Sequence, residues 1–247
     1  MSQVSNKFEK ILFKIQHREF ITHTGIFNNK KISVISSGIG TDNIDIVLNE
    51  LDAIVNIDLK TKKINDFKKS LDIVRLGTSG SLNNNINLDT FIASEYAIGF
   101  DGLAHFYDND IVLEKNLQNE FINHTKWDTK HALPYALKAS DNLLKKFDEI
   151  KKGITLTATG FYAPQTRELR LKSSVRDLYD KIKDFKYNRC DITNFEMETS
   201  ALYFLGKSLG HNTLTLCAVL GNRLEDKQSN KPLKTINKLI DIVLERL

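Results

Sequence analysis

Apolar runs and amphipathic segments alternate along most of the chain. The apolar runs predict buried strands at 71–76, 91–95, 153–159 and 213–220. Apolar residues that recur every three or four positions predict helices at 44–54, 133–147 and 235–247. Strands that alternate with helices, without a linker or a repeat, are typical of an α/β fold. We therefore expect one domain over residues 1–247, with a central mixed β-sheet flanked by helices.

The first forty residues favour a β-hairpin that leads into a helix. Residues 8–15 are typical of a helix end that passes into a strand, and residues 19–26 alternate as a strand does. Asn28-Asn29 is a turn signal, and residues 31–36 form the expected return strand. The next segment, Ser37-Gly-Ile-Gly-Thr-Asp-Asn43, resembles half of a dinucleotide-binding fingerprint but lacks its third glycine. We expect a tight strand-to-helix turn there rather than a cofactor site.

A further helix, predicted to begin at Asn194, carries two carboxylates in its first turn. Asn194 is a favourable N-cap, and the apolar positions from Ala201 to Leu209 repeat at helical spacing. Glu196 and Glu198 would lie about 200° apart around such a helix, so we expect them to point in different directions. Two interpretations stay open. In the first, both acids stabilise the positive end of the helix dipole. In the second, one of them, with Met197 beside it, faces a cleft and binds a polyol.

An arginine in an apolar strand is a second unusual feature. Arg75 lies near the end of the strand predicted at 71–76. The segment that follows, Gly77-Thr-Ser-Gly80, offers hydroxyl and backbone donors of the kind that bind phosphate. A guanidinium group in such a strand requires an anion or a carboxylate. A phosphate site and an internal ion pair therefore both remain open.

Polar and aromatic residues gather in a loop after the strand at 153–159. This loop, Phe161-Tyr-Ala-Pro-Gln-Thr-Arg167, combines two aromatic rings with an amide and a guanidinium group. Arg223 leaves the end of the strand at 213–220 in a similar position. Loops at strand ends are where α/β proteins bind ligands, so this loop suits a flat, hydrogen-bonding ring. An ordinary surface loop is the alternative.

Composition and charge exclude several classes of protein. The net charge is +4, and no dense basic block is interleaved with aromatic residues, so we expect no nucleic-acid partner. No apolar run approaches the roughly 20 residues of a membrane span, and the first residues do not resemble a signal peptide, so we expect no membrane partner. Cys190 and Cys217 lack metal-ligand spacing. We expect no metal site and a cytoplasmic location.

Three of these segments together resemble the nucleoside phosphorylase family, and within it the uridine phosphorylases. The segments are Arg75-Leu-Gly-Thr-Ser-Gly80, the Phe-Tyr-x-x-Gln-x-Arg pattern from Phe161 to Arg167, and Phe195-Glu-Met-Glu198. The resemblance runs from His17-Arg-Glu-Phe20 to the C-terminal helix. It implies phosphorolysis of uridine to uracil and ribose 1-phosphate in nucleoside salvage. Inorganic phosphate would be the co-substrate, and no organic cofactor would be needed.

The resemblance also implies roles for individual residues. The residues expected to hold phosphate are Arg75, Thr78 and, from a neighbouring subunit, Arg18. The residues expected to bind the nucleoside are Thr78, Phe161, Gln165, Arg167, Glu196, Met197, Glu198 and Arg223. Among these, Glu198 would bind the ribose hydroxyls, and Gln165 and Arg167 would bind the uracil edge. The residues expected to contribute most to catalysis are Arg75, Gln165, Arg167 and Glu198.

Two departures bear on substrate and activity. Purine phosphorylases and the related nucleosidases place a catalytic aspartate after the last core strand, where this chain has Gly221-Asn-Arg223. A pyrimidine substrate is therefore favoured over a purine phosphorylase or nucleosidase activity. Family members also carry a first strand and a Gly-Asp-Pro-x-Arg phosphate loop, for which we find no counterpart after Met1. Without that strand we expect a bare strand edge and weaker phosphate binding.

These departures leave two hypotheses of different class. The first is an active uridine phosphorylase that works as a dimer-based homohexamer with active sites shared between subunits. The second is a non-catalytic or impaired nucleoside-binding remnant that lacks part of the phosphate site. The survival of Arg18, Arg75, Gln165, Arg167 and Glu198 favours the first.

Overall fold

The centre of the protein is a mixed β-sheet of eight strands in the computed structural model, which describes residues 1–108 and 110–247. In order across the sheet, its strands are β13 (Lys227–Gln228), β12 (Asn212–Asn222), β6 (Asp72–Ser81), β11 (Cys190–Glu196), β9 (Lys151–Thr157), β7 (Phe91–Gly99) and β8 (Tyr135–Lys138), with β10 (Lys186–Tyr187) paired to β11. Strand β12 runs parallel to β6 and antiparallel to β7. These pairings close β12, β6, β11, β9 and β7 into a ring.

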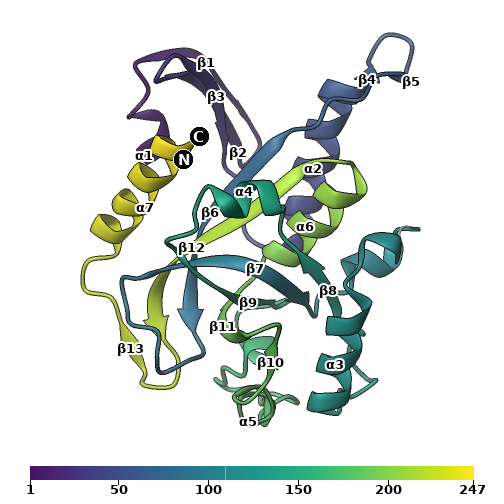
Figure 1. The fold of residues 1–247 in the computed structure, drawn as a ribbon, viewed down its shortest axis with the longest axis vertical. Helices are drawn as coiled ribbons and strands as arrows, with labels where there is room; N and C mark the ends of the chain where they lie inside the picture. Colours follow the sequence, from purple (N-terminus) through teal and green to yellow (C-terminus); the bar gives the residue numbers. More distant parts are fainter. Residues whose placement is uncertain (109) are drawn as a thin grey trace.

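Helices surround this ring (Figure 1). The longer helices are α2 (Thr41–Asn56), α3 (Lys115–Thr125), α6 (Thr199–Ser208) and α7 (Pro232–Arg246). The shorter ones are α1 (Ser2–Ser5), α4 (Asp141–Lys145), α5 (Leu178–Ile182) and the 3-10 turns η1 (Leu103–Phe106), η2 (Asp110–Val112) and η3 (Ala163–Gln165). Helix α6 packs between the ring and α2, whereas α7 packs against β6 and β12 (Figure 1). The predicted fold class, an α/β domain with a mixed central sheet flanked by helices, is confirmed.

The N-terminal residues form a second sheet with three antiparallel strands, β1 (Lys10–His17), β2 (Phe20–Phe27) and β3 (Lys30–Ile35). The predicted turn is confirmed, since Asn28 and Asn29 have positive φ values of 48° and 61° between β2 and β3. Apolar residues of this sheet pack on α1 and α7, so the two chain ends lie side by side (Figure 1). A small hairpin of β4 (Ile57–Asp58) and β5 (Lys63–Ile64) projects from the end of α2 (Figure 1).

One edge of β6 is unpaired over most of its length. Strand β12 pairs with β6 along residues 72–81 on one edge. On the other edge, among the described residues, β11 pairs only with Gly80 and Ser81. A bare strand edge of the kind expected from the sequence is thus present, and it borders the cavity described below.

The predicted helix at 133–147 is wrong. The segment instead forms strand β8, which pairs antiparallel with β7, followed by the short helix α4. Its apolar residues Tyr135, Ala136 and Leu137 are all fully buried, so both faces of β8 contact the core. A strand that is buried on both faces has no alternation by which it could be told from a buried helix.

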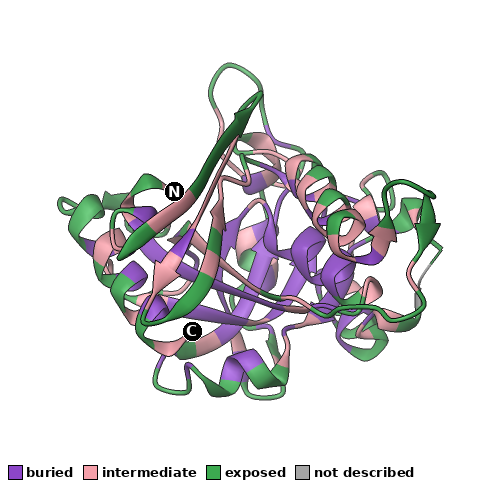
Figure 2. Ribbon diagram, turned by 90° about the horizontal axis from the view of Figure 1, so that it is seen from above, coloured by how far each residue is buried: buried purple, intermediate pink, exposed green. Residues whose placement is uncertain are grey.

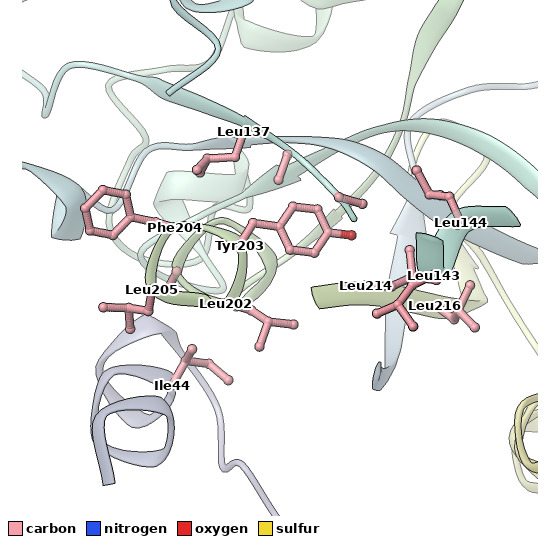
Figure 3. Close-up of a cluster of buried hydrophobic side chains, with 14 of the residues drawn as sticks. Ile44, Leu137, Leu143, Leu144, Leu202, Tyr203, Phe204, Leu205, Leu214 and Leu216 are labelled. Carbon is pink, nitrogen blue, oxygen red and sulfur yellow. The ribbon is translucent and has the colours of Figure 1, made fainter. Parts of the chain in front are cut away.

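The main core lies between the ring and α6 (Figure 3). Leu202, Phe204 and Leu205 of α6 are almost completely buried, and Ile44 of α2 packs beside them. The strands of the central sheet are mostly buried, whereas exposed residues lie along the N-terminal sheet, the outer helices and the loops (Figure 2). No helix of the described residues is long and apolar enough to cross a bilayer.

Tyr203 of α6 joins two strands through one hydroxyl group. It donates a hydrogen bond to the Ser94 carbonyl at 2.6 Å and accepts one from the Thr215 amide at 2.9 Å. We expect Tyr203→Phe to lower the free energy of unfolding by about 1–3 kcal/mol, because both buried groups lose this partner. Urea unfolding checks this, with Tyr162→Phe, at an exposed ring, as the control. Equal changes in both variants would contradict the structural role of the Tyr203 hydroxyl.

Candidate active site

A cavity of about 610 Å³ lies beside β6 and the end of β11. Its volume is in the range of small-molecule sites. Most of the site residues predicted from the sequence line it, namely Arg75, Thr78, Phe161, Gln165, Arg167, Glu196, Met197 and Glu198. The rest of its wall comes from the turn before α2 and from apolar residues of α1, β12 and α7. The fold therefore brings segments that are far apart in the sequence to one cavity.

Arg75 occupies the middle of β6, because this strand continues to Ser81 rather than ending at Leu76. Its Nη1 lies 3.1 Å from Oε2 of Glu196, and its Nη2 donates a hydrogen bond to Oε2 of Glu198. Burial opposes the positive charge, but the two carboxylates outweigh it and raise the pKa of Arg75. The internal ion pair considered from the sequence is thus present, and it lies in the cavity wall.

The two glutamates converge on Arg75 because the segment that carries them is not helical. Asn194 lies within β11, where its side-chain oxygen accepts hydrogen bonds from Thr155 and Thr193. Helix α6 begins only at Thr199. The predicted N-cap at Asn194 is wrong, and so is the expectation that Glu196 and Glu198 diverge. The pairing of β11 with β9 and β6 decided the conformation here over local helix signals.

Glu196 is buried at the N-terminus of α6. Its carboxylate accepts hydrogen bonds from the backbone N–H groups of Glu198 at 3.0 Å and Thr199 at 2.9 Å, and from the Thr157 hydroxyl at 2.6 Å. The helix-dipole interpretation thus fits Glu196. Burial raises the pKa of Glu196, and Arg75 opposes this effect.

Glu198 faces the cavity and is held by the turn that precedes α2. Its Oε1 accepts a hydrogen bond of 2.7 Å from the backbone N–H of Gly40. Gly38 and Gly40 have φ values of 68° and 95°, which glycine adopts readily. The sequence interpretation of this segment as a tight turn is confirmed, but its contact with Glu198 was missed. The available signal was a glycine turn that places a helix N-terminus at the carboxyl end of a strand.

Gln165 and two arginines form the opposite end of the site. Oε1 of the buried Gln165 accepts hydrogen bonds from Arg223 at 2.8 Å and from Arg167 at 3.3 Å. The Gln165 amide N–H groups are therefore left to donate to a ligand. The Arg167 guanidinium also lies over the Phe161 ring, 3.6 Å from its centroid.

Neither arginine at this end of the site has a carboxylate partner among residues 1–108 and 110–247. Burial lowers the pKa of Arg223 to about 10, and burial also lowers the pKa of Arg167. Both groups remain positively charged near neutral pH. This end of the cavity therefore favours a ring that carries or develops negative charge.

Of the predicted site residues, Arg223 does not itself line the cavity but binds Gln165 in its wall, and Arg18 is not among the wall residues. Arg18 is exposed in the turn between β1 and β2, where its φ is 52°. Its expected role in the site of a neighbouring subunit stays a prediction. Asn222 belongs to the segment Gly221-Asn-Arg223, where purine-specific relatives are expected to have an aspartate, and it is buried and caps the next turn by accepting hydrogen bonds from the Leu224 and Glu225 amides.

Comparisons with known proteins identify the family to which the chain belongs. A family model described as the phosphorylase superfamily matches residues 1–246. A uridine phosphorylase of Thermococcus kodakarensis is 27% identical over 214 residues, covering 85% of this chain and 65% of the relative, so this chain spans less than two thirds of that protein. A DeoD-type purine nucleoside phosphorylase of Clostridium novyi is 26% identical over 250 residues, covering 97% and 86%.

Among solved structures, a nucleoside phosphorylase of Trypanosoma brucei, described as showing uridine phosphorylase activity, is similar over the whole chain. It is 27% identical with a TM-score of 0.87, covering 100% of this chain and 89% of that one. The relatives thus include proteins named for pyrimidine and for purine nucleosides. They identify the family of this chain but not the base of its substrate.

Proposed function

Since this chain belongs to the phosphorylase superfamily, we propose that it cleaves uridine with inorganic phosphate to give uracil and ribose 1-phosphate. The observation that carries this proposal is the division of one cavity into two ends of different chemistry. Arg75 and two glutamates lie at one end, and Gln165 with two carboxylate-free arginines lies at the other. Such a site can hold a sugar and an anion beside a flat ring that leaves as an anion.

The first end of the cavity is suited to ribose and phosphate. The carboxylate of Glu198 can accept hydrogen bonds from two sugar hydroxyls, with Met197 packed against the sugar. Arg75 and Thr78 project into the same space and supply donors for phosphate. Phosphate bound there would attack the anomeric carbon as the glycosidic bond breaks, and its negative charge would stabilise the positive charge that develops on the sugar.

The second end of the cavity is suited to uracil. The amide N–H groups of Gln165 can donate to a ring carbonyl, while Phe161 stacks beside the ring. Arg167 and Arg223 would stabilise the negative charge that the base acquires as the bond breaks. Positioning and electrostatics would carry the reaction, so no covalent nucleophile, metal or organic cofactor is part of this proposal.

The charges at the first end of the cavity, where phosphate would bind, favour a contribution from a neighbouring subunit. Glu196 and Glu198 place two carboxyl groups at this end beside the single positive charge of Arg75. A phosphate dianion would bind more favourably if another cation entered the site. We propose that Arg18 of a neighbouring copy supplies it, in a homo-oligomer of the dimer-based hexamer type with shared active sites.

The second end of the cavity, where the base would bind, suits a pyrimidine better than a purine. In the described part of the chain, the carboxylates that line the cavity are Glu196 and Glu198, both at the ribose end. The segment expected to carry the acid that protonates a purine is Gly221-Asn-Arg223 in this chain, and its Asn222 side-chain oxygen is used in a turn. Without an acid there, the guanidinium groups favour a base that can leave as an anion, as uracil can.

Uracil release from uridine tests the proposal directly. We expect release by the purified chain to require inorganic phosphate, and inosine to be cleaved at least about tenfold more slowly, a difference of about 1.4 kcal/mol in transition-state binding. Chromatography of the free base and of ribose 1-phosphate measures both. Release without phosphate would indicate a hydrolase, and faster release from inosine would indicate a purine enzyme. Binding of uridine without release would favour the non-catalytic alternative.

A further inference from the structure

A buried hydroxyl group behind the cavity contacts one of the two site carboxylates. Thr157, the last residue of β9, has no exposed surface and does not line the cavity. Its Oγ1 lies 2.6 Å from Oε1 of Glu196 and 3.0 Å from the backbone nitrogen of Ser200. The Ser200 N–H can only donate, so Thr157 accepts that hydrogen bond and gives its single proton to Glu196.

A second carboxylate fixes the other side of this arrangement. The Ser200 hydroxyl donates to Oδ2 of Asp101 at 2.8 Å, and the Tyr135 hydroxyl donates to Oδ1 of Asp101 at 2.7 Å. Burial, reinforced by Asp101, raises the pKa of Tyr135, so it remains a donor. Ser200 therefore binds Asp101 through its hydroxyl group and Thr157 through its backbone N–H, and Thr157 in turn donates to Glu196.

The position of Glu196 determines how firmly Arg75 is held. Oε1 accepts hydrogen bonds from the Thr157 hydroxyl at 2.6 Å and, at 3.1 Å, from the Thr199 N–H, and the carboxylate presents Oε2 to Arg75, at 3.1 Å from Nη1. That contact is not aligned as a hydrogen bond, so Nη1 keeps its capacity to donate. Without the Thr157 hydroxyl, Glu196 would keep its backbone donors but lose its shortest hydrogen bond, and Oε1 could turn toward the guanidinium group to form a two-oxygen pair, which is the stronger arrangement. Such a bidentate pair would compete with an anion for Arg75.

We propose that Thr157 is a positioning residue that restrains Glu196 and so keeps Arg75 available to an anion in the cavity. The inference rests on the proposed function only for the identity of that anion as phosphate. Thr157 does not touch substrate, so its effect passes entirely through Glu196 and Arg75.

Three variants separate this role from a general effect on the core. Thr157→Val removes the hydroxyl at nearly constant volume, and Thr157→Ser keeps it. Thr155→Val is the matched control, because Thr155 lies on the same strand, is equally buried, and donates to Asn194 at 2.9 Å without contacting Glu196. Thr157→Ala replaces the valine variant if the latter does not fold.

The Kd for inorganic phosphate, measured by calorimetry on the full chain, is the primary readout. We expect Thr157→Val to weaken phosphate binding at least fivefold, and Thr157→Ser and Thr155→Val to stay within twofold of the unaltered protein. In steady-state assays, the KM for phosphate should rise more than the KM for uridine, which a merely structural loss would not produce.

Each outcome decides the proposal. Unchanged phosphate affinity in Thr157→Val overturns it, as does an equal loss in Thr155→Val or a failure of serine to restore binding. An unaltered chain that binds phosphate but releases no uracil contradicts the proposed function, while the comparison of Kd values still decides the role of Thr157. If the unaltered chain binds no phosphate, the proposed role of Thr157 is overturned together with the proposed function.

Discussion

Replacing Arg75 with alanine is expected to reduce uracil release by about three orders of magnitude. Loss of one preorganised donor to developing charge typically costs about 10²- to 10³-fold in rate. Here the loss of Arg75 also leaves Glu196 and Glu198 without the cation that both contact. The remaining negative charge would repel phosphate from the site. Initial rates at saturating uridine and varied phosphate measure the effect.

The same substitution is expected to destabilise the fold, since it leaves buried carboxylates unpaired. Removing one partner of a buried ion pair typically costs about 3–5 kcal/mol in the free energy of unfolding. The double variant Arg75→Ala/Glu196→Gln removes one of the two acids and should recover part of that stability. It should recover none of the activity. If the double variant regained both, Arg75 would serve the fold and not the reaction.

Replacing Arg223 with methionine is expected to lower kcat/KM for uridine about 10²- to 10³-fold. Two guanidinium groups donate to Oε1 of Gln165, and that of Arg223 is the closer, at 2.8 Å. The Arg223 guanidinium also donates to the Gln165 backbone carbonyl. Its loss would free the Gln165 side chain to rotate and would remove one of two positive charges near the leaving base. Steady-state kinetics with uridine at saturating phosphate checks the expectation.

A nearby arginine provides the matched control for Arg223. Arg170 lies in the same region of the chain as Gln165 but is exposed, whereas Arg223 is bound directly to Gln165. Arg170→Met should change kcat/KM less than twofold, because an exposed charge is screened by solvent and salt. Similar losses in both variants would mean that net charge, rather than the contact with Gln165, determines activity.

Local patterns in the sequence were sufficient to single out several residues that line the cavity. Arg75 was singled out because an apolar strand rarely carries a guanidinium group, and Gln165 and Arg167 because they follow a buried strand in a loop. These features depend on burial and on chain order, both of which composition and periodicity indicate. The structure places these residues in the wall of one cavity.

Contacts between distant segments were not accessible in this way. The sequence predicted that Glu196 and Glu198 diverge on a helix, yet the pairing of β11 with its neighbours extends the chain through Glu196, and both acids contact Arg75. The contact of Glu198 with Gly40 joins residues 158 positions apart. No local propensity contains that information, because such contacts form only when the whole sheet has closed.

The sequence alone therefore determined the fold class and most of the polar side chains singled out in the cavity wall, since burial and periodicity are properties of each segment. Only the tertiary structure decided which charges meet and which hydroxyl groups restrain them. Thr157 illustrates the difference. In the sequence it is one more β-branched residue of a buried strand, but in the fold its hydroxyl contacts a site carboxylate from behind. The physical reason is that a hydrogen bond depends on distances of a few tenths of an ångström, which packing between strands sets.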